Sequence, residues 1–231
     1  MLELRDLSFA YGAVKAVNGV NLRVHQGSIH GLIGPNGAGK TTTIDLVSGK
    51  RRPSGGQILY RGEDITPRSV SWKRHHGISR SFQRITVFPG MTVADQLDLA
   101  ARAVADDGLD HIVEELDLER VLDLPCSRIA YGEQRRVDIA LALLGNPELV
   151  LLDEPAAGLS RDESLVLADH LALLARDRGT TVVIVEHHLE VVFRICSQLT
   201  VLEQGSVISD GPPEQVRKDP RVMEAYLGRA A

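Results

Sequence analysis

The chain has 231 residues, long enough for one large α/β domain and short for two, and its 43% hydrophobic and 25% charged residues are ordinary values for a globular protein. Its formal net charge of -5 argues against a protein that coats nucleic acid, and we expect no nucleic-acid partner. The two cysteines, Cys126 and Cys196, are far apart in sequence, which argues against a disulfide framework or a zinc site and predicts two small buried residues.

The first residues lack the basic and then apolar layout of a signal peptide. No apolar run approaches the roughly 18 residues that a membrane span needs. We therefore expect a cytoplasmic protein, and any membrane process that it serves requires another chain to cross the bilayer.

The first part of the chain predicts short strands separated by turns. We expect strands at residues 2–7, 14–20 and 21–24, followed by a strand at 29–33. A glycine-rich loop comes next, and a helix at 41–47 leaves it.

The glycine-rich loop at residues 34–41 reads GPNGAGKT and fits G-x-x-x-x-G-K-[ST], the phosphate-binding loop of nucleoside triphosphatases. Its glycines let successive backbone N–H groups point at the phosphates, Lys40 reaches the β- and γ-phosphates, and Thr41 offers its hydroxyl to Mg²⁺. The alternative is a glycine-rich turn that binds no ligand. The expected nucleotide-binding residues here are Gly34, Pro35, Asn36, Gly37, Ala38, Gly39, Lys40, Thr41 and Thr42.

The middle of the chain changes character. After strands expected at 57–60 and 78–82, the pattern from 92 to 144 is mostly helical, with apolar residues at helical spacing. We interpret residues 84–147 as a helical insert within an α/β scaffold.

A fully apolar run at residues 149–152 predicts a strand buried on both faces, and it delivers Asp153 and Glu154 at its end. Asp153 suits a Mg²⁺ ligand, and Glu154 suits the polarisation of an attacking water. The alternative is a strand that simply ends in a charged turn.

The last third returns to alternating strands and helices. Ser160 and Glu163 form a capping box before a helix that ends at Gly179, a strand follows at 181–185, and a hairpin is expected at 198–210. The predicted fold is one α/β domain with a mostly parallel sheet, an antiparallel N-terminal β subdomain and the helical insert.

Residues 129–136, IAYGEQRR, open an apolar helix shortly before the acidic strand. This run resembles the signature motif of ATP-binding cassette (ABC) ATPases, usually Leu-Ser-Gly-Gly-Gln. A helix N-terminus offers backbone N–H groups and a positive dipole end to a phosphate. The resemblance implies that Ala130, Tyr131, Gly132 and Glu133 serve ATP held by the opposite protomer, so that hydrolysis needs a dimer. The alternative is a capped core helix without a ligand.

Other positions match the same family residue by residue. The resemblance implies that Tyr11 stacks on adenine, although a tyrosine at a strand end is the plainer alternative. It implies that Gln83 touches Mg²⁺ and the attacking water and links the site to a membrane partner. It also implies that His187 contacts the γ-phosphate, although a lone histidine after a strand is more often structural.

Together these expectations define the site and make the chain an ATPase that converts ATP and water to ADP and phosphate. The expected cofactors are ATP and Mg²⁺. The expected catalytic residues are Glu154, His187, Gln83 and Lys40, and the expected metal ligands are Thr41, Gln83 and Asp153.

The resemblance covers essentially the whole chain and is strongest to the ATP-binding subunits that energise uptake of branched-chain and other hydrophobic amino acids. The residues that carry it are at 81–93, 130–132, 156–159, 185–187, 211–216 and 225–228. It implies an importer subunit on the inner face of the cell membrane. Its partners would be a second ABC ATPase subunit, identical or paralogous, and separate transmembrane permease subunits.

Four alternatives remain open. ATPases of lipopolysaccharide export and of urea uptake share parts of these motifs. A soluble ABC ATPase of DNA repair or translation would usually carry a long coiled coil or a second cassette. A generic helicase or regulatory GTPase would lack the signature, and a GTPase would carry Asn-Lys-x-Asp, which is absent from the sequence.

Overall fold

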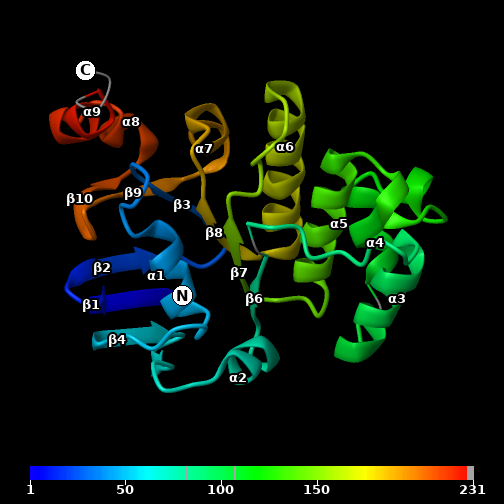
Figure 1. Ribbon diagram of the computed structural model, residues 1–231, viewed down its shortest axis with the longest axis horizontal. Coiled ribbons are helices and arrows are strands. Elements are labelled where there is room, and N and C mark those ends of the chain that lie inside the picture. Colours follow the sequence, from blue (N-terminus) through cyan, green and yellow to red (C-terminus); the bar gives the residue numbers. More distant parts are fainter. Residues whose placement is uncertain (82, 107, 228–231) are drawn as a thin grey trace.

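The computed structural model describes residues 1–81, 83–106 and 108–227, and in these residues two sheets organise the fold (Figure 1). The smaller sheet is antiparallel throughout, with strand order β2-β1-β4-β5. It forms the predicted N-terminal β subdomain. Its strands are β1 (Leu2–Tyr11), β2 (Val14–Val24), β4 (Gly55–Tyr60) and β5 (Glu63–Asp64).

The two strands predicted at 14–20 and 21–24 are one continuous strand, β2. The register of β1 against β2 shifts between Leu4 and Leu7, which marks a bulge. There the Asn21 side chain accepts a hydrogen bond from Asp6 N (3.0 Å) and donates one to Asp6 Oδ1 (2.9 Å). The Asn21 side chain therefore satisfies polar groups of Asp6 at the bulge, and β2 continues past it to Val24.

The larger sheet has six strands in the order β10-β9-β3-β8-β7-β6, and its ladders are parallel except for the β9–β10 hairpin. This confirms the predicted mostly parallel α/β fold. The strand expected at 78–82 ends at Arg80, and position 82 lies outside the described residues. The strands are β3 (Ile29–Ile33), β6 (Ile78–Arg80), β7 (Leu149–Asp153), β8 (Thr181–Val185), β9 (Gln198–Glu203) and β10 (Ser206–Gly211).

The larger sheet separates two hydrophobic cores. Leu149 and Leu151 of β7 pack into the core shared with the smaller sheet, whereas Val150 and Leu152 pack into the core beneath the helices. Successive residues of a strand point to opposite faces, so both faces of β7 are buried, as the apolar run predicts.

Helices flank the sheets. The capping box at Ser160 is confirmed: Ser160 N donates to Glu163 Oε2 at 2.8 Å, Glu163 N donates to Ser160 Oγ at 3.3 Å, and the helix ends at Gly179 with φ 64°. The helices are α1 (Lys40–Val47), α2 (Val70–His75), α3 (Val93–Val104), α4 (Leu109–Glu115), α5 (Tyr131–Leu143), α6 (Arg161–Arg178), α7 (Leu189–Ile195), α8 (Pro213–Val216) and α9 (Pro220–Leu227), with short 3₁₀ turns at Glu119–Val121 and Cys126–Arg128.

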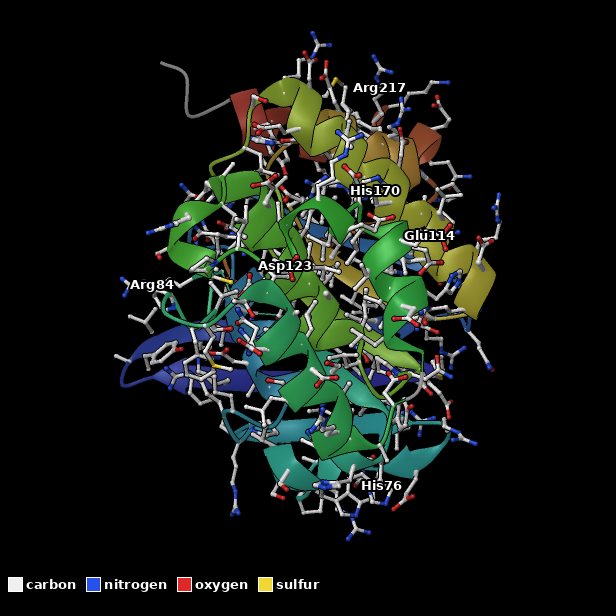
Figure 2. All side chains as sticks on the ribbon, turned by 90° about the vertical axis from the view of Figure 1, so that its right-hand side faces the viewer. His76, Arg84, Glu114, Asp123, His170 and Arg217 are labelled. Carbon is white, nitrogen blue, oxygen red and sulfur yellow. The ribbon has the colours of Figure 1, made fainter. Side chains whose placement is uncertain are left out.

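Helices α3, α4 and α5 lie together at one end of the molecule (Figure 1). Their buried residues join the core beneath the sheet, while exposed charges such as Arg84, Glu114 and Asp123 lie on the face shown in Figure 2. The boundaries 84–147 of the helical insert stay a prediction.

The structure also bears on the cysteines and on helix length. Cys126 and Cys196 are free and buried, as predicted. No helix in the described ranges is long and apolar enough to cross a membrane.

Candidate nucleotide-binding site

The phosphate-binding loop joins β3 to α1 with three glycines at positive φ: Gly34 (144°), Gly37 (79°) and Gly39 (101°). Two of these positions also exclude any side chain. A Cβ atom on Gly34 would lie 2.0 Å from Leu202 O, and one on Gly39 would lie 2.2 Å from Ala16 O. The tight course of the loop therefore needs glycine for its backbone angles and for its closeness to neighbouring strands.

Lys40 is buried at the first turn of α1. Its ammonium donates to Gly34 O at 2.7 Å and to Pro35 O at 2.9 Å, so the loop wraps around this charge. Burial lowers the pKa of Lys40, and the negative charges of Glu154 and Asp153 act in the opposite direction. The loop thus holds a cation beside two carboxylates.

Thr41 and Asp153 bring a hydroxyl and a carboxylate together across 112 positions of sequence: Thr41 Oγ1 donates to Asp153 Oδ1 at 3.1 Å. Burial raises the pKa of Asp153, and the positive charge of Arg80 opposes that shift. Mg²⁺ commonly takes one or two protein oxygens and completes its shell with phosphate and water. The donor set beside the phosphate loop therefore fits Mg²⁺.

Two other predicted site residues, Gln83 and His187, hydrogen-bond to Glu154. Gln83 Nε2 donates to Glu154 Oε2 at 2.7 Å, and His187 Nε2 donates to Glu154 Oε1 at 2.6 Å. The structure thus places the Gln83 amide on Glu154, and its role as a metal ligand stays a prediction. Glu154 has φ 52°, a left-handed conformation that costs a non-glycine residue about 1–3 kcal/mol and often accompanies a functional constraint.

Glu154 and His187 line a pocket of about 320 Å³ together with most of the phosphate loop, whereas Gln83 and Asp153 do not belong to its described lining. Tyr11 lies at its rim, 45% exposed, with its ring edge-on to Phe9 and with the Arg51 guanidinium 4.7 Å from its centroid. The residue is therefore partly exposed beside the phosphate loop, and its stacking on adenine stays a prediction. The pocket is lined by Tyr11, Ala16, Asn36, Gly37, Ala38, Gly39, Lys40, Thr41, Thr42, Glu154 and His187.

The signature run begins helix α5. The helix starts at Tyr131, earlier than the apolar segment suggests, because Glu133 Oε2 accepts a hydrogen bond from Ala130 N at 2.7 Å and caps the first turn. Tyr131 lies against Gly158, where a Cβ atom would come within 2.8 Å of its ring. Ala130, Gly132 and Glu133 line a different pocket, of about 340 Å³, whose described lining contains no residue of the phosphate loop.

Sequence reasoning missed several side chains that hold the site together. Arg135, fully buried, donates to Gln83 O at 2.9 Å, and Asp138 accepts from Thr86 N and Oγ1 at 3.0 and 2.7 Å. Both belong to α5, so the helix that begins with the signature residues is hydrogen-bonded to the segment that carries Gln83. Polar residues within an apolar helix were the signal that could have revealed them.

Glu186 is another such residue. Its buried carboxylate accepts from Ala156 N at 2.7 Å and from His187 N at 2.9 Å. It therefore ties the loop after Glu154 to the loop that carries His187. Its position at the end of an apolar strand was the available signal.

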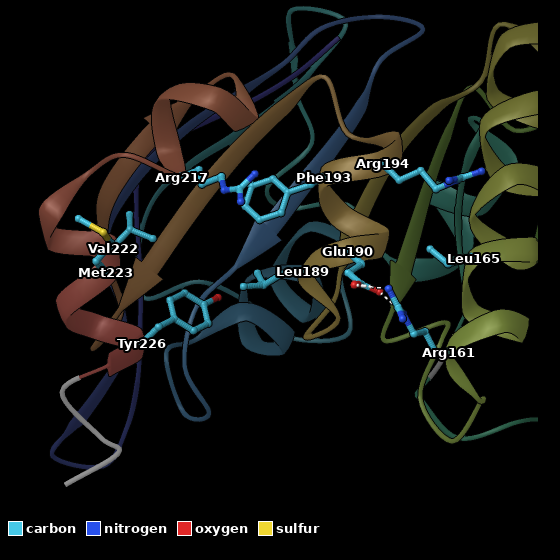
Figure 3. Close-up of a pocket in the computed structure, with 10 residues that line it drawn as sticks. All are labelled: Arg161, Leu165, Leu189, Glu190, Phe193, Arg194, Arg217, Val222, Met223 and Tyr226. Atoms are coloured by element: carbon cyan, nitrogen blue, oxygen red, sulfur yellow. Dashed lines mark hydrogen bonds and ion pairs between the residues drawn. The ribbon is translucent and has the colours of Figure 1, made fainter.

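A larger pocket of about 810 Å³ lies away from these residues, between α7 and the C-terminal helices (Figure 3). Its lining is largely apolar, and Arg161 forms an ion pair with Glu190 at 2.6 Å beside it. None of the predicted nucleotide-site residues belongs to its described lining.

Comparison with known proteins agrees with this geometry. The family model described as ABC transporter matches residues 17–157, and the one described as Branched-chain amino acid ATP-binding cassette transporter matches residues 206–231. The chain is 35% identical to the high-affinity branched-chain amino acid transport ATP-binding protein BraF of Pseudomonas aeruginosa, over 100% of this chain and 98% of that protein. It is 34% identical to the lipopolysaccharide export system ATP-binding protein LptB of Escherichia coli, over 98% and 97% respectively.

Solved structures give the same result. A nucleotide-free ATP-binding cassette from an ABC transporter matches with a TM-score of 0.89 and 27% identity, over 98% of both chains. The ADP conformation of an ATP-binding cassette matches with a TM-score of 0.89 and 28% identity, over 99% of both chains. The chain therefore belongs to the ABC transporter family of ATP-binding proteins.

Proposed function

We propose that this chain is the ATP-hydrolysing subunit of an ABC importer for branched-chain or other hydrophobic amino acids. The observation that carries the ATPase assignment is the convergence of Gln83 and His187 on Glu154, beside the phosphate loop. The C-terminal match to the branched-chain amino acid model and the likeness to BraF support the substrate class.

In the proposed reaction the loop N–H groups and Lys40 hold the phosphates of ATP. Thr41 and Asp153 would hold Mg²⁺, which would neutralise part of the phosphate charge. Glu154 accepts a proton from the attacking water, and His187 and Gln83 fix the orientation of its two carboxylate oxygens. The contact of His187 with the γ-phosphate stays a prediction.

The partner of this subunit is a second ABC ATPase subunit. In one copy the phosphate loop and the signature residues line separate pockets. Each pocket therefore supplies half of a site in which ATP is bound between the phosphate loop of one subunit and the signature residues of the other. The N-terminus of α5, a helix of 13 residues, offers its first N–H groups and its positive dipole end to the γ-phosphate of ATP on the opposite subunit.

Mixing two inactive variants tests this arrangement when the chain pairs with itself. Lys40→Ala damages the phosphate loop and Gly132→Asp damages the signature. Mixed dimers contain one doubly damaged site and one intact site, so we expect ATPase activity to return on mixing. If each site were built within one subunit, both sites would stay damaged and no activity would return. Mixing each variant with itself is the control.

Separate transmembrane permeases are the second partner. Phe88, 62% exposed, lies on the segment that follows Gln83, and an exposed aromatic side chain suits a protein contact. We expect Phe88→Ser to weaken co-purification with co-expressed branched-chain amino acid permeases. Leu173→Ser, at a residue 42% exposed on α6, is the matched control and should leave co-purification unchanged.

Reconstitution of this subunit with the permeases in vesicles tests the direction of transport and the transported solute. We expect a complex with these permeases to drive uptake of labelled leucine in an ATP-dependent way. The likeness to LptB makes lipopolysaccharide export the second candidate. ATP-dependent extraction of lipopolysaccharide without leucine uptake would favour it.

A further inference from the structure

Arg80 joins three elements of the nucleotide-binding region with one guanidinium group. It is the last residue of β6, and its Nη1 atom lies 2.5 Å from Asp45 Oδ1 and 3.0 Å from Ser48 Oγ at the end of α1. Its Nη2 atom lies 3.1 Å from Asp153 Oδ2 at the end of β7. The edge strand, the helix that leaves the phosphate loop and the acidic strand are therefore tied together here.

The contact completes a two-sided hold on Asp153. Thr41 and Asp45 are one turn apart on α1 and so share a face of that helix. Thr41 donates to Oδ1 of Asp153 directly, whereas Asp45 reaches Oδ2 through Arg80. Both carboxylate oxygens are thus fixed relative to the helix that carries the phosphate loop.

Because the network around Arg80 is buried, we infer that it mainly fixes the orientation of its side chains and adds little to stability. The side chains of Arg80, Asp45 and Asp153 are 7%, 6% and 1% exposed. Desolvation of buried charges offsets most of their attraction, so a buried ion pair is weak evidence of added stability. A planar guanidinium does, however, fix the orientation of a carboxylate.

We propose that Arg80 is a positioning residue for the metal site. It holds Asp153 Oδ2 and thereby keeps Oδ1 turned toward the Thr41 hydroxyl, where Mg²⁺ takes its protein ligands. The inference rests on the proposed ATPase function, and nothing in the sequence motifs of the phosphate loop or the acidic strand assigns this role to Arg80.

The test measures metal binding and nucleotide binding separately. With a non-hydrolysable ATP analogue, the Mg²⁺ concentration at half-saturation is determined by calorimetry, and Mn²⁺ binding by electron paramagnetic resonance. Affinity for the analogue in EDTA is measured in parallel. For Arg80→Met we expect the half-saturating Mg²⁺ concentration to rise about 10–100-fold, with metal-free affinity unchanged. Arg80→Lys keeps a cation at this position and should fall between wild type and Arg80→Met.

The control is Arg178→Met, which removes a comparably buried ion pair between α6 and Glu115 of α4, with side chains 11% and 10% exposed; neither residue lines the nucleotide pocket. It should lower the melting temperature and leave Mg²⁺ binding unchanged. The proposal fails if folded Arg80→Met or Arg80→Lys binds Mg²⁺ as wild type does, or more tightly. It also fails if metal-free affinity falls by the same factor. A wild-type protein without Mg²⁺-dependent nucleotide binding would instead count against the proposed function.

Discussion

His187 Nε2 lies 2.6 Å from Glu154 Oε1, although the two residues are 33 positions apart in the chain. Each follows a strand of the larger sheet: Glu154 follows β7 and His187 comes shortly after β8, which pairs with β7 in parallel. The carboxyl ends of neighbouring parallel strands meet at one edge, where open α/β sheets bind ligands. The hydrogen bond orients one of the two carboxylate oxygens of Glu154, the group that accepts the proton in the proposed reaction.

We expect Glu154→Gln to bind ATP, to lose roughly 10²–10⁴-fold in turnover, and to accumulate as an ATP-bound dimer. The amide keeps the shape of the side chain but cannot accept the proton of water. Turnover is measured by phosphate release and dimerisation by analytical ultracentrifugation. Glu214→Gln, at an exposed residue of α8, is the control. Wild-type turnover in Glu154→Gln would remove Glu154 from this role.

We expect Lys40→Ala to lose about 10–100-fold in ATP affinity, because a charge-assisted hydrogen bond to phosphate contributes about 1.5–3 kcal/mol. Calorimetry with the non-hydrolysable analogue measures the affinity. Lys218→Ala removes an exposed lysine and should bind normally. Unchanged affinity in Lys40→Ala would contradict the assignment of the phosphate loop.

We expect acid to destabilise the fold through His30. Its Nε2 atom shares a hydrogen bond with Thr200 Oγ1 at 2.8 Å, and burial lowers the pKa of His30 from 6.5 to about 4. Because the unfolded chain binds the proton more readily, the stability present above pH 6.5 is lost as pH falls toward 4. This group alone predicts a free energy of unfolding about 2 kcal/mol lower at pH 5 than at pH 7.

Urea unfolding of wild type and His30→Gln at both pH values isolates this contribution. The variant should lose less stability than wild type between pH 7 and pH 5. His75→Gln, at an exposed residue of α2, should behave as wild type does. Equal losses in wild type and His30→Gln would show that His30 does not carry the effect.

We expect Ser160→Ala to lower the free energy of unfolding by about 1 kcal/mol, because it removes the side-chain cap from the N-terminus of α6. Ser160→Asp keeps an acceptor at the same position and should restore most of the loss. Urea titration measures both variants. A loss of the same size in Ser160→Asp would mean that the cap is not the cause.

Local chemistry made much of the site predictable from the sequence. Positions 34 and 39 require glycine because of their backbone angles and their close approach to neighbouring backbone atoms. The loop can therefore be recognised from its sequence motif alone. The strand before Asp153 could be predicted because a strand that is buried on both faces is apolar throughout. The boundaries of α6 follow from its own capping residues.

Contacts between distant segments were not predictable in this way. Arg80 precedes the motif that carries Gln83, and its ion pairs with Asp45 and Asp153 span 35 and 73 positions. Arg135 reaches Gln83 O across 52 positions. The ion-pair or hydrogen-bond partner of a single arginine or aspartate cannot be predicted from the sequence, because it depends on how strands and helices pack.

The sequence by itself determined that this chain has a phosphate-binding loop, an acidic strand and an ABC signature, because each depends on residues that are neighbours along the chain. Only the tertiary structure decided that Gln83 and His187 both reach Glu154, that Arg80 and Thr41 hold opposite oxygens of Asp153, and that loop and signature line different pockets. The physical reason is that strand order and helix packing, rather than chain order, set the distances between side chains.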